Sequence, residues 1–178
     1  PLPLFLYNIP AQTKLMISVE AVKTLAKHPN IIGMKDSSSN GTYFNTLLAE
    51  VKAEHPDFTI LVGPDEMLAS TMALGGNGGV NSGSNLFPEL YVNLFKACKA
   101  KDTERTLKLQ KLVMKVSTGV YSVDKSSVSF LKGLKAALFT EGLITDYICE
   151  PLQKVNGTDL ETIRKNVAEL KQQISQVL

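Results

Sequence analysis

The sequence predicts an α/β fold in which a parallel sheet is followed by a segment made only of helices. Short apolar runs alternate with amphipathic stretches over residues 2–99, turn-forming residues separate them, and no strand-like run follows residue 102. Strands that alternate with helices form parallel sheets, because a parallel neighbour can be reached only through a crossover. The predicted division is a sheet-containing part at residues 1–100 and a helical extension at residues 101–178.

Four strand–helix units are expected in the first part. The strands are predicted at residues 2–7, 31–35, 58–62 and 79–82, and the helices that follow them at 19–28, 42–54, 65–74 and 88–99. Ser18 is the candidate N-cap of the first helix, since its hydroxyl can accept a bond from a free first-turn N–H. The glycine-rich segment 75–79 precedes its strand, so a tight turn explains it better than a phosphate loop.

The helical extension is predicted to contain three helices, at residues 104–116, 126–139 and 160–178. Gly119 and Gly142 interrupt the apolar patterns between them. Thr158, with Glu161 three residues later, matches a capping box for the last helix. We expect these helices to pack on the outside of the sheet-containing part or to form an oligomer contact.

Composition excludes several classes of protein. The chain has 178 residues, of which 44% are apolar, enough to bury a sizeable core. It has no apolar stretch of membrane-spanning length, and its net charge of +2 comes from interspersed residues without a basic stripe. Cys98 and Cys149 lack metal-ligand or redox spacing, which predicts free, buried thiols. These features predict a cytoplasmic protein that binds neither membrane nor nucleic acid.

Lys35 carries the first chemical signal, because it ends the second predicted strand and is followed by Asp36 and three serines. An amine at a strand end is partly removed from water, which favours the neutral form that attacks carbonyl carbons. Taken alone, the same residues fit a surface lysine at the start of a loop at least as well. The residues at the ends of the other strands are needed to choose between the two interpretations.

Polar and small residues follow all four predicted strands. In parallel α/β folds the ligands bind where the carboxyl ends of the strands meet, so these residues are expected to line one rim. Together they offer an amine, a phenol that can transfer protons, carboxylates, hydroxyls and a glycine that allows close approach to the backbone. The candidate site residues are Tyr7, Lys35, Ser37, Gly63, Asp65, Glu66 and Ser82.

Three segments resemble the second half of the dihydrodipicolinate synthase/N-acetylneuraminate lyase family of class I aldolases. They are residues 6–10 (Leu-Tyr-Asn-Ile-Pro), residues 33–37 (Gly-Met-Lys-Asp-Ser) and the glycine-rich run through Val80. The resemblance implies the second half of a (β/α)8 TIM barrel with extra C-terminal helices, no metal, no other cofactor, and a homotetramer. It also implies that Lys35 holds pyruvate as a Schiff base and that Tyr7 transfers protons to and from the substrate.

The resemblance leaves the substrate open. Dihydrodipicolinate synthases usually carry a carboxylate-binding arginine where this chain has Gln12, which weakens that alternative. Sialic acid lyases and 2-keto-3-deoxy sugar acid aldolases match better, so the expected reaction is reversible cleavage of such a 2-oxo acid to pyruvate and an aldehyde. For Asp65 and Glu66, acids at a helix N-terminus are the structural alternative. The residues expected to bind the sugar are Ser37, Gly63, Asp65, Glu66 and Ser82.

A complete barrel needs eight strand–helix units, and this chain supplies four. The family's Gly-Thr-Thr loop, which binds the pyruvate carboxylate, and its second relay tyrosine lie in the other half. We therefore expect a C-terminal piece that is inactive alone, needs its N-terminal half-barrel as a partner, and would otherwise expose sheet edges and an apolar face. The remaining alternative is a non-catalytic barrel fragment or binding module.

Overall fold

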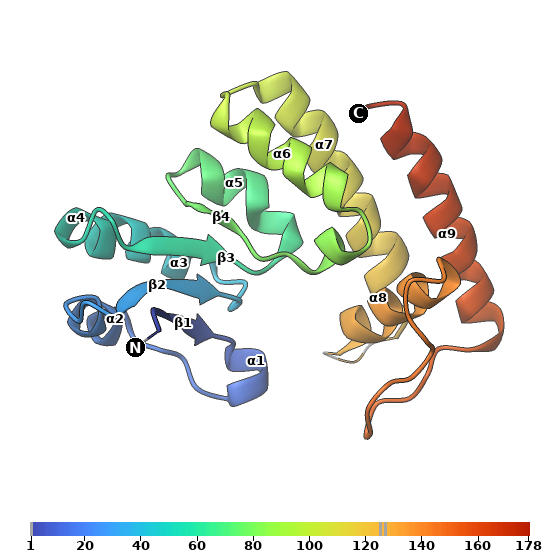
Figure 1. Ribbon diagram of the computed structural model, residues 1–178, viewed down its shortest axis with the longest axis horizontal. Coiled ribbons are helices and arrows are strands. Elements are labelled where there is room, and N and C mark those ends of the chain that lie inside the picture. Colours follow the sequence, from blue (N-terminus) through green and yellow to red (C-terminus); the bar gives the residue numbers. More distant parts are fainter. Residues whose placement is uncertain (1, 125, 127) are drawn as a thin grey trace. The chain divides into compact units, whose positions relative to one another are not determined.

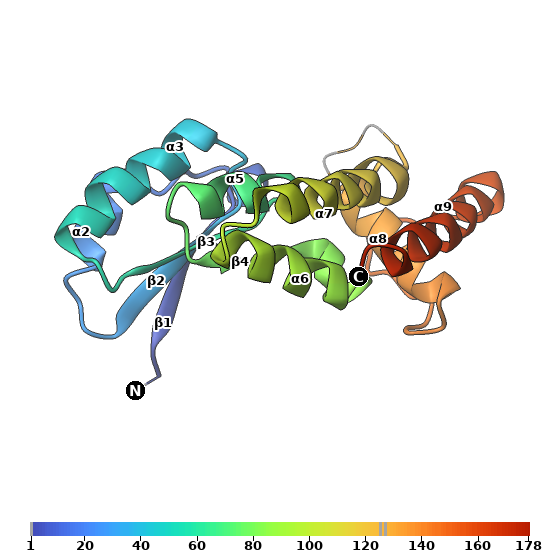
Figure 2. The same ribbon diagram turned by 90° about the horizontal axis from the view of Figure 1, so that it is seen from above.

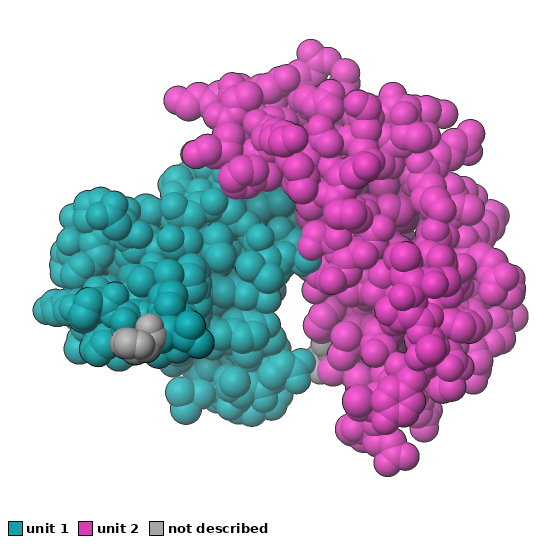
Figure 3. Space-filling model, viewed as in Figure 1, with its two compact units in different colours: residues 1–81 teal, residues 82–178 magenta. Residues whose placement is uncertain are grey.

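The computed structural model describes residues 2–124, 126 and 128–178. The chain forms two compact units, Pro1–Asn81 and Ser82–Leu178, which Figure 3 shows in different colours. Each unit has buried apolar side chains of its own. The predicted division is a different one, because it separates a half-barrel at residues 1–100 from a helical extension at residues 101–178. That division stays a prediction.

A four-stranded parallel sheet forms the centre of the first unit. Its strands are β1 (Leu4–Asn8), β2 (Ile31–Asp36), β3 (Thr59–Val62) and β4 (Gly78–Gly79), and they pair in the order β1-β2-β3-β4 (Figure 1). Every pairing is parallel. The predicted α/β class with a parallel sheet is confirmed.

The helices of the first unit cover one face of this sheet. Figure 2 shows α2 (Val19–Leu25), α3 (Gly41–Thr46) and α5 (Leu68–Ala73) on the same side. The helix that starts as α3 continues through η1 (Leu47–Val51) and α4 (Lys52–Glu54). Met34, Ile60 and Val62 point to this face and are fully buried, each contributing about 1.5–3 kcal/mol of hydrophobic stabilisation. On the opposite face of β1, Phe5 is 44% and Tyr7 is 49% exposed.

Local signals account for most of the element boundaries in the first unit. Ser18 accepts a hydrogen bond from the Ala21 N–H at 3.2 Å, which confirms the predicted N-cap of α2. The short helix α1 (Pro10–Thr13) was not predicted; it begins at a proline, whose fixed φ suits the first position of a helix.

The fourth strand is shorter than predicted. Gly78 and Gly79 pair with β3, and the Val80 N–H adds one further bond to the Val62 carbonyl at 2.9 Å. The buried side chain of Asn81 then donates to the Gly63 carbonyl at 2.9 Å, in place of a continued main-chain ladder. The prediction of a strand through Ser82 is wrong, because Ser82–Asn85 forms the 3-10 helix η3.

The second unit is helical in the residues described. It contains α6 (Pro88–Lys99), α7 (Thr103–Val116), the π-helical turn η4 (Ser117–Tyr121), α8 (Ser129–Thr140) and α9 (Gly157–Ser175). α6 has the predicted bounds, and it runs antiparallel to α7 (Figures 1 and 2). The predicted capping box at Thr158 is wrong: the N-cap of α9 is Asn156, in extended conformation, so Thr158 lies inside the first turn.

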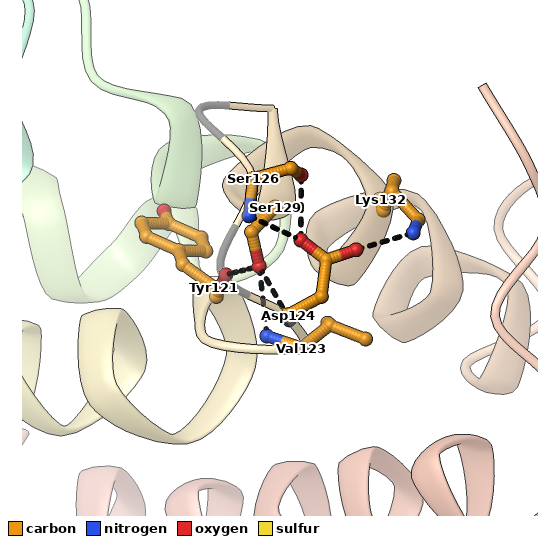
Figure 4. Close-up of polar contacts among 6 residues, drawn as sticks. All are labelled: Tyr121, Val123, Asp124, Ser126, Ser129 and Lys132. Carbon is orange, nitrogen blue, oxygen red and sulfur yellow. Dashed lines mark hydrogen bonds and ion pairs between the residues drawn. The ribbon is translucent and has the colours of Figure 1, made fainter. Parts of the chain in front are cut away.

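A buried serine joins η4 to α8. The Ser129 hydroxyl donates to the Tyr121 carbonyl at 2.7 Å and accepts from the N–H groups of Val123 and Asp124 at 2.9 and 3.0 Å (Figure 4). The Lys132 ammonium and the Ser126 hydroxyl bind the Asp124 carboxylate and lower its pKa to about 2. These contacts fix the entry into α8.

Composition predicts that the chain has no membrane-spanning segment and that its two cysteines are free and buried. Among the described residues, no helix combines the length and the apolar character that crossing a membrane would require. Both cysteines are free, but the predicted burial is wrong for Cys149, which is exposed, and only partly right for Cys98. Burial raises the pKa of the Cys98 thiol.

Candidate active site

Tyr7 and Lys35 lie side by side at the carboxyl ends of β1 and β2. The sheet register pairs these two residues, and both point to the face opposite the helices. The Lys35 Nζ donates to the Tyr7 hydroxyl at 3.3 Å and lies 4.5 Å from the centroid of the Tyr7 ring. An amine and a phenol at this separation can act on the same small substrate, one as nucleophile and the other in proton transfer.

The next residue on each strand points to the other face. Asn8 and Asp36 are paired in the register, both are 1% exposed, and the Asn8 amide donates to the Asp36 carboxylate at 2.8 Å. Ser38 gives the same carboxylate a main-chain and a hydroxyl hydrogen bond, at 3.1 and 2.9 Å. The period of two along each strand therefore places reactive groups on one face and a buried polar pair on the other.

Burial shifts two pKa values in this polar pair and its surroundings. It raises the pKa of the Asp36 carboxyl, although the hydrogen bonds from Asn8 and Ser38 act in the opposite direction. Burial, with a smaller effect from the Asp36 charge, raises the pKa of Tyr43 to about 12. The Tyr43 hydroxyl stays protonated at neutral pH and donates to the Ile17 carbonyl at 2.7 Å.

The rim beyond the strands is held by hydrogen bonds between successive strand ends. The Ser37 N–H donates to the Asn8 carbonyl at 2.8 Å, and the Gly63 N–H donates to the Asp36 carbonyl at 2.7 Å. Ser37 and Gly63 touch each other: a Cβ added to Gly63 would lie 2.0 Å from the Ser37 hydroxyl oxygen. Ser37 therefore occupies space that exists only because residue 63 is a glycine.

The other candidate residues have different environments. Asp65 and Glu66 open the 3-10 helix η2 (Asp65–Met67) after β3; Asp65 is 3% exposed, and Glu66 is exposed. Gln12 is exposed on α1. Ser82 begins η3 in the second unit, so the geometry of the first unit does not include it. Among the candidate residues, the first unit thus shows two contacts: Lys35 with Tyr7, and Ser37 with Gly63.

Sequence reasoning missed Asn8 and Asp36 as partners of the site. Asparagine and aspartate are common turn formers after strands, so their residue types alone do not indicate that the two side chains bind each other. The available signal was their position directly after Tyr7 and Lys35, because a shift of one residue along a strand moves a side chain to the opposite face of the sheet. The contact itself depends on the sheet register.

Gly63→Ala should lower the free energy of unfolding by about 1–3 kcal/mol, because the new methyl group overlaps the Ser37 hydroxyl. Urea unfolding of the two proteins measures the difference. Ser37→Gly in the same chain removes the overlapping atoms and should restore part of the loss. A Gly63→Ala protein as stable as the parent would mean that Ser37 can leave this position without cost.

A sequence comparison identifies the family. The pattern that defines the Dihydrodipicolinate synthetase family matches residues 1–170. This chain belongs to that family. Within the family, it is 31% identical over 174 residues to an uncharacterised DapA-like lyase of Pyrococcus furiosus, covering 97% of this chain and 56% of the relative. It is 35% identical over 132 residues to Escherichia coli YagE, provisionally named a 2-dehydro-3-deoxy-D-gluconate aldolase, covering 74% of this chain and 43% of YagE.

Solved structures of the family have the same fold. A dihydrodipicolinate synthase from Bacteroides thetaiotaomicron superposes with a TM-score of 0.89 and 43% identity, over 95% of this chain and 56% of that enzyme. The structure of YagE in complex with pyruvate gives a TM-score of 0.86 and 29% identity, over 95% of this chain and 56% of YagE. The chain therefore spans somewhat more than half the length of these family members.

Within residues 2–124, 126 and 128–178, no group of three or more His, Cys, Asp or Glu side chains is arranged to hold a metal ion. The arrangement that does occur in the first unit is an amine beside a phenol.

Proposed function

We propose that this chain is the C-terminal half of the (β/α)8 barrel of a class I aldolase, in which Lys35 binds a 2-oxo acid as a Schiff base. The observation that carries the proposal is the 3.3 Å contact between the Lys35 Nζ and the Tyr7 hydroxyl at the carboxyl edge of a parallel sheet. The uncovered face of β1, with Phe5 and Tyr7 half exposed, is the face that an N-terminal half-barrel would close. We call the assembly of both halves the complete enzyme.

The proposed reaction starts when the neutral Lys35 amine attacks the ketone carbon of the 2-oxo acid. The resulting carbinolamine takes the Tyr7 hydroxyl proton and loses water, which leaves a tyrosinate and an iminium that withdraws electrons from the neighbouring carbons. Tyr7 accepts the proton of the C4 hydroxyl while the C3–C4 bond breaks. The electron pair of that bond forms an enamine with the iminium, and the aldehyde departs. Protonation of the enamine at C3 and hydrolysis release pyruvate and the free lysine. Condensation is the same sequence in reverse.

The substrate we propose is a sialic acid or a 2-keto-3-deoxy sugar acid. Gln12 supports it, because a neutral amide cannot pair with a substrate carboxylate as an arginine would. The provisional name of YagE, a sugar acid aldolase, also supports it. Glu66 is exposed at the start of η2 and is suited to accept from sugar hydroxyls, whereas the buried Asp65 offers less surface to a ligand. The proposed sugar-binding residues are Ser37, Gly63, Asp65, Glu66 and Ser82.

A second candidate activity is dihydrodipicolinate synthesis from pyruvate and aspartate semialdehyde. The 43% identity to a synthase of Bacteroides thetaiotaomicron favours it. Both candidates use the same Schiff base on Lys35 and differ in the aldehyde. A binding module without turnover would keep the fold and lose the chemistry. A homotetrameric state and a cytoplasmic location stay predictions.

Assaying the complete enzyme with all three substrates decides between the activities. We expect cleavage of a 2-keto-3-deoxy sugar acid or of sialic acid to be faster than condensation of pyruvate with aspartate semialdehyde. Efficient condensation would overturn the interpretation of Gln12. Turnover of none of the substrates, with pyruvate still bound, would favour the binding module.

The variant Glu66→Ala tests the proposed sugar contact. It should weaken sugar-acid cleavage by about tenfold and leave covalent capture of pyruvate unchanged, because pyruvate has no polyol tail to reach η2. The kcat/KM for cleavage and the rate of capture are the two measurements. Equal losses in both would show that Glu66 supports the fold of the rim and does not contact the sugar.

A further inference from the structure

The two strands that carry the reactive residues end in two successive pairs of side chains, and each pair has one member on β1 and one on β2. On one face Tyr7 and Lys35 are neighbours across the strands, and one position later Asn8 and Asp36 are neighbours on the other face. The first pair is accessible, with Tyr7 49% exposed, and the second is buried. The two contacts therefore depend on the same register of β1 against β2.

The Asn8 side chain forms three hydrogen bonds with its surroundings. Its amide nitrogen donates to the Asp36 carboxylate at 2.8 Å and to the Met16 sulfur at 3.1 Å, and its oxygen accepts from the Ile17 N–H at 3.1 Å. These partners come from β2 and from the segment between α1 and α2. A buried amide with all of these bonds made has one favourable orientation, so it fixes the end of β1 in place.

Asp36 fixes the end of β2 in a similar way. One carboxylate oxygen accepts from Asn8 and from the Ser38 N–H, and the other accepts from the Ser38 hydroxyl. A buried carboxylate whose amide partner is removed loses a bond that water cannot replace. The strand end is therefore held at the residue that follows Lys35, where a small displacement of the backbone would be amplified along the long lysine side chain.

We propose that Asn8 and Asp36 are positioning residues, whose buried hydrogen bond holds the Lys35 amine within reach of the Tyr7 hydroxyl. The inference rests on the proposed function, since it assigns these two residues a role in that site. Neither side chain contacts the substrate face of the sheet. They act on the site by fixing the register of β1 against β2, because the reactive pair lies directly beside the buried pair on the same two strands.

The test compares Asp36→Ala and Asp36→Asn in the complete enzyme. Asparagine keeps an oxygen that can accept from Asn8 and from the Ser38 N–H, whereas alanine removes every acceptor. We expect kcat for cleavage to fall about 10- to 100-fold in Asp36→Ala, with a much smaller change in the KM for the cleaved 2-oxo acid, and to stay within about threefold of the parent in Asp36→Asn. Asn8→Ala breaks the same bond from the other strand and should repeat the loss if Asp36→Ala does not fold.

Met34→Ala is the matched control for a purely structural effect. Met34 lies on β2, two residues before Asp36 on the same face, and is fully buried, so its truncation weakens the core without touching the polar pair. Turnover per folded molecule should be unchanged in Met34→Ala, even though its melting temperature falls. Activities are compared at a temperature where every variant is folded by circular dichroism.

The outcomes separate this inference from the proposed function. Capture of pyruvate on Lys35 in the parent, together with loss of kcat in Asp36→Ala and recovery in Asp36→Asn, supports both. Capture in the parent with equal turnover in Asp36→Ala and Met34→Ala overturns the positioning role alone, as does a folded Asp36→Asn protein that stays as slow as Asp36→Ala. Absence of capture in the parent overturns the proposed function and this inference with it.

Discussion

Lys35→Met should abolish both turnover and covalent capture of pyruvate in the complete enzyme. Methionine keeps much of the length and apolar character of the side chain but has no nitrogen to form an imine, so the reaction loses its covalent intermediate. Lys35 is only partly buried and does not belong to the apolar core, so the variant should fold. Substrate cleavage and mass spectrometry after borohydride reduction measure the two losses.

Lys27→Met is the matched control for Lys35→Met. Lys27 is an exposed lysine just after α2, and the same substitution there should change neither turnover nor capture. Substantial turnover in Lys35→Met would contradict the assignment of Lys35, whatever the control shows.

Tyr7→Phe should lower turnover by about two to four powers of ten. The substitution removes the hydroxyl that lies 3.3 Å from the Lys35 Nζ and keeps the ring 4.5 Å from it, so packing at the end of β1 is retained. Proton transfer from the C4 hydroxyl should become slow, while the amine remains available. Single-turnover kinetics separate the two steps: imine formation should change less than C3–C4 cleavage.

Tyr91→Phe provides a comparison for the loss of a phenol. Tyr91 is buried in α6 of the second unit, and the proposed mechanism gives its hydroxyl no role in proton transfer. If Tyr7→Phe left turnover unchanged, Tyr7 would be a packing residue, and the proton acceptor would have to be sought elsewhere.

The sheet could be predicted because its signals are local. The apolar runs that became β1, β2 and β3 are bounded by turn formers, and the strand ends carry the residues that the resemblance assigned to the reaction. The fourth strand was harder to predict, because Gly78 and Gly79 have no side chains to show a period and the ladder stops where Asn81 takes over a hydrogen bond. Short elements leave little pattern to interpret.

The polar pair behind the site could not be predicted from the sequence. Asn8 and Asp36 are 28 positions apart, and their contact depends on the register of β1 and β2, which a single sequence does not specify. The contact between Ser37 and Gly63 is of the same kind, since it depends on how close two neighbouring strand ends come. Residue types could be assigned to the rim from sequence, but their separations could not.

Capture of pyruvate on a single lysine tests the central claim most directly. The complete enzyme is incubated with pyruvate, reduced with borohydride, digested, and its peptides are mapped by mass spectrometry. The proposed mechanism predicts one stable adduct on the peptide that carries Lys35, and none when pyruvate or borohydride is omitted. An adduct on a different lysine, or no adduct in an enzyme that still cleaves its substrate, would contradict it.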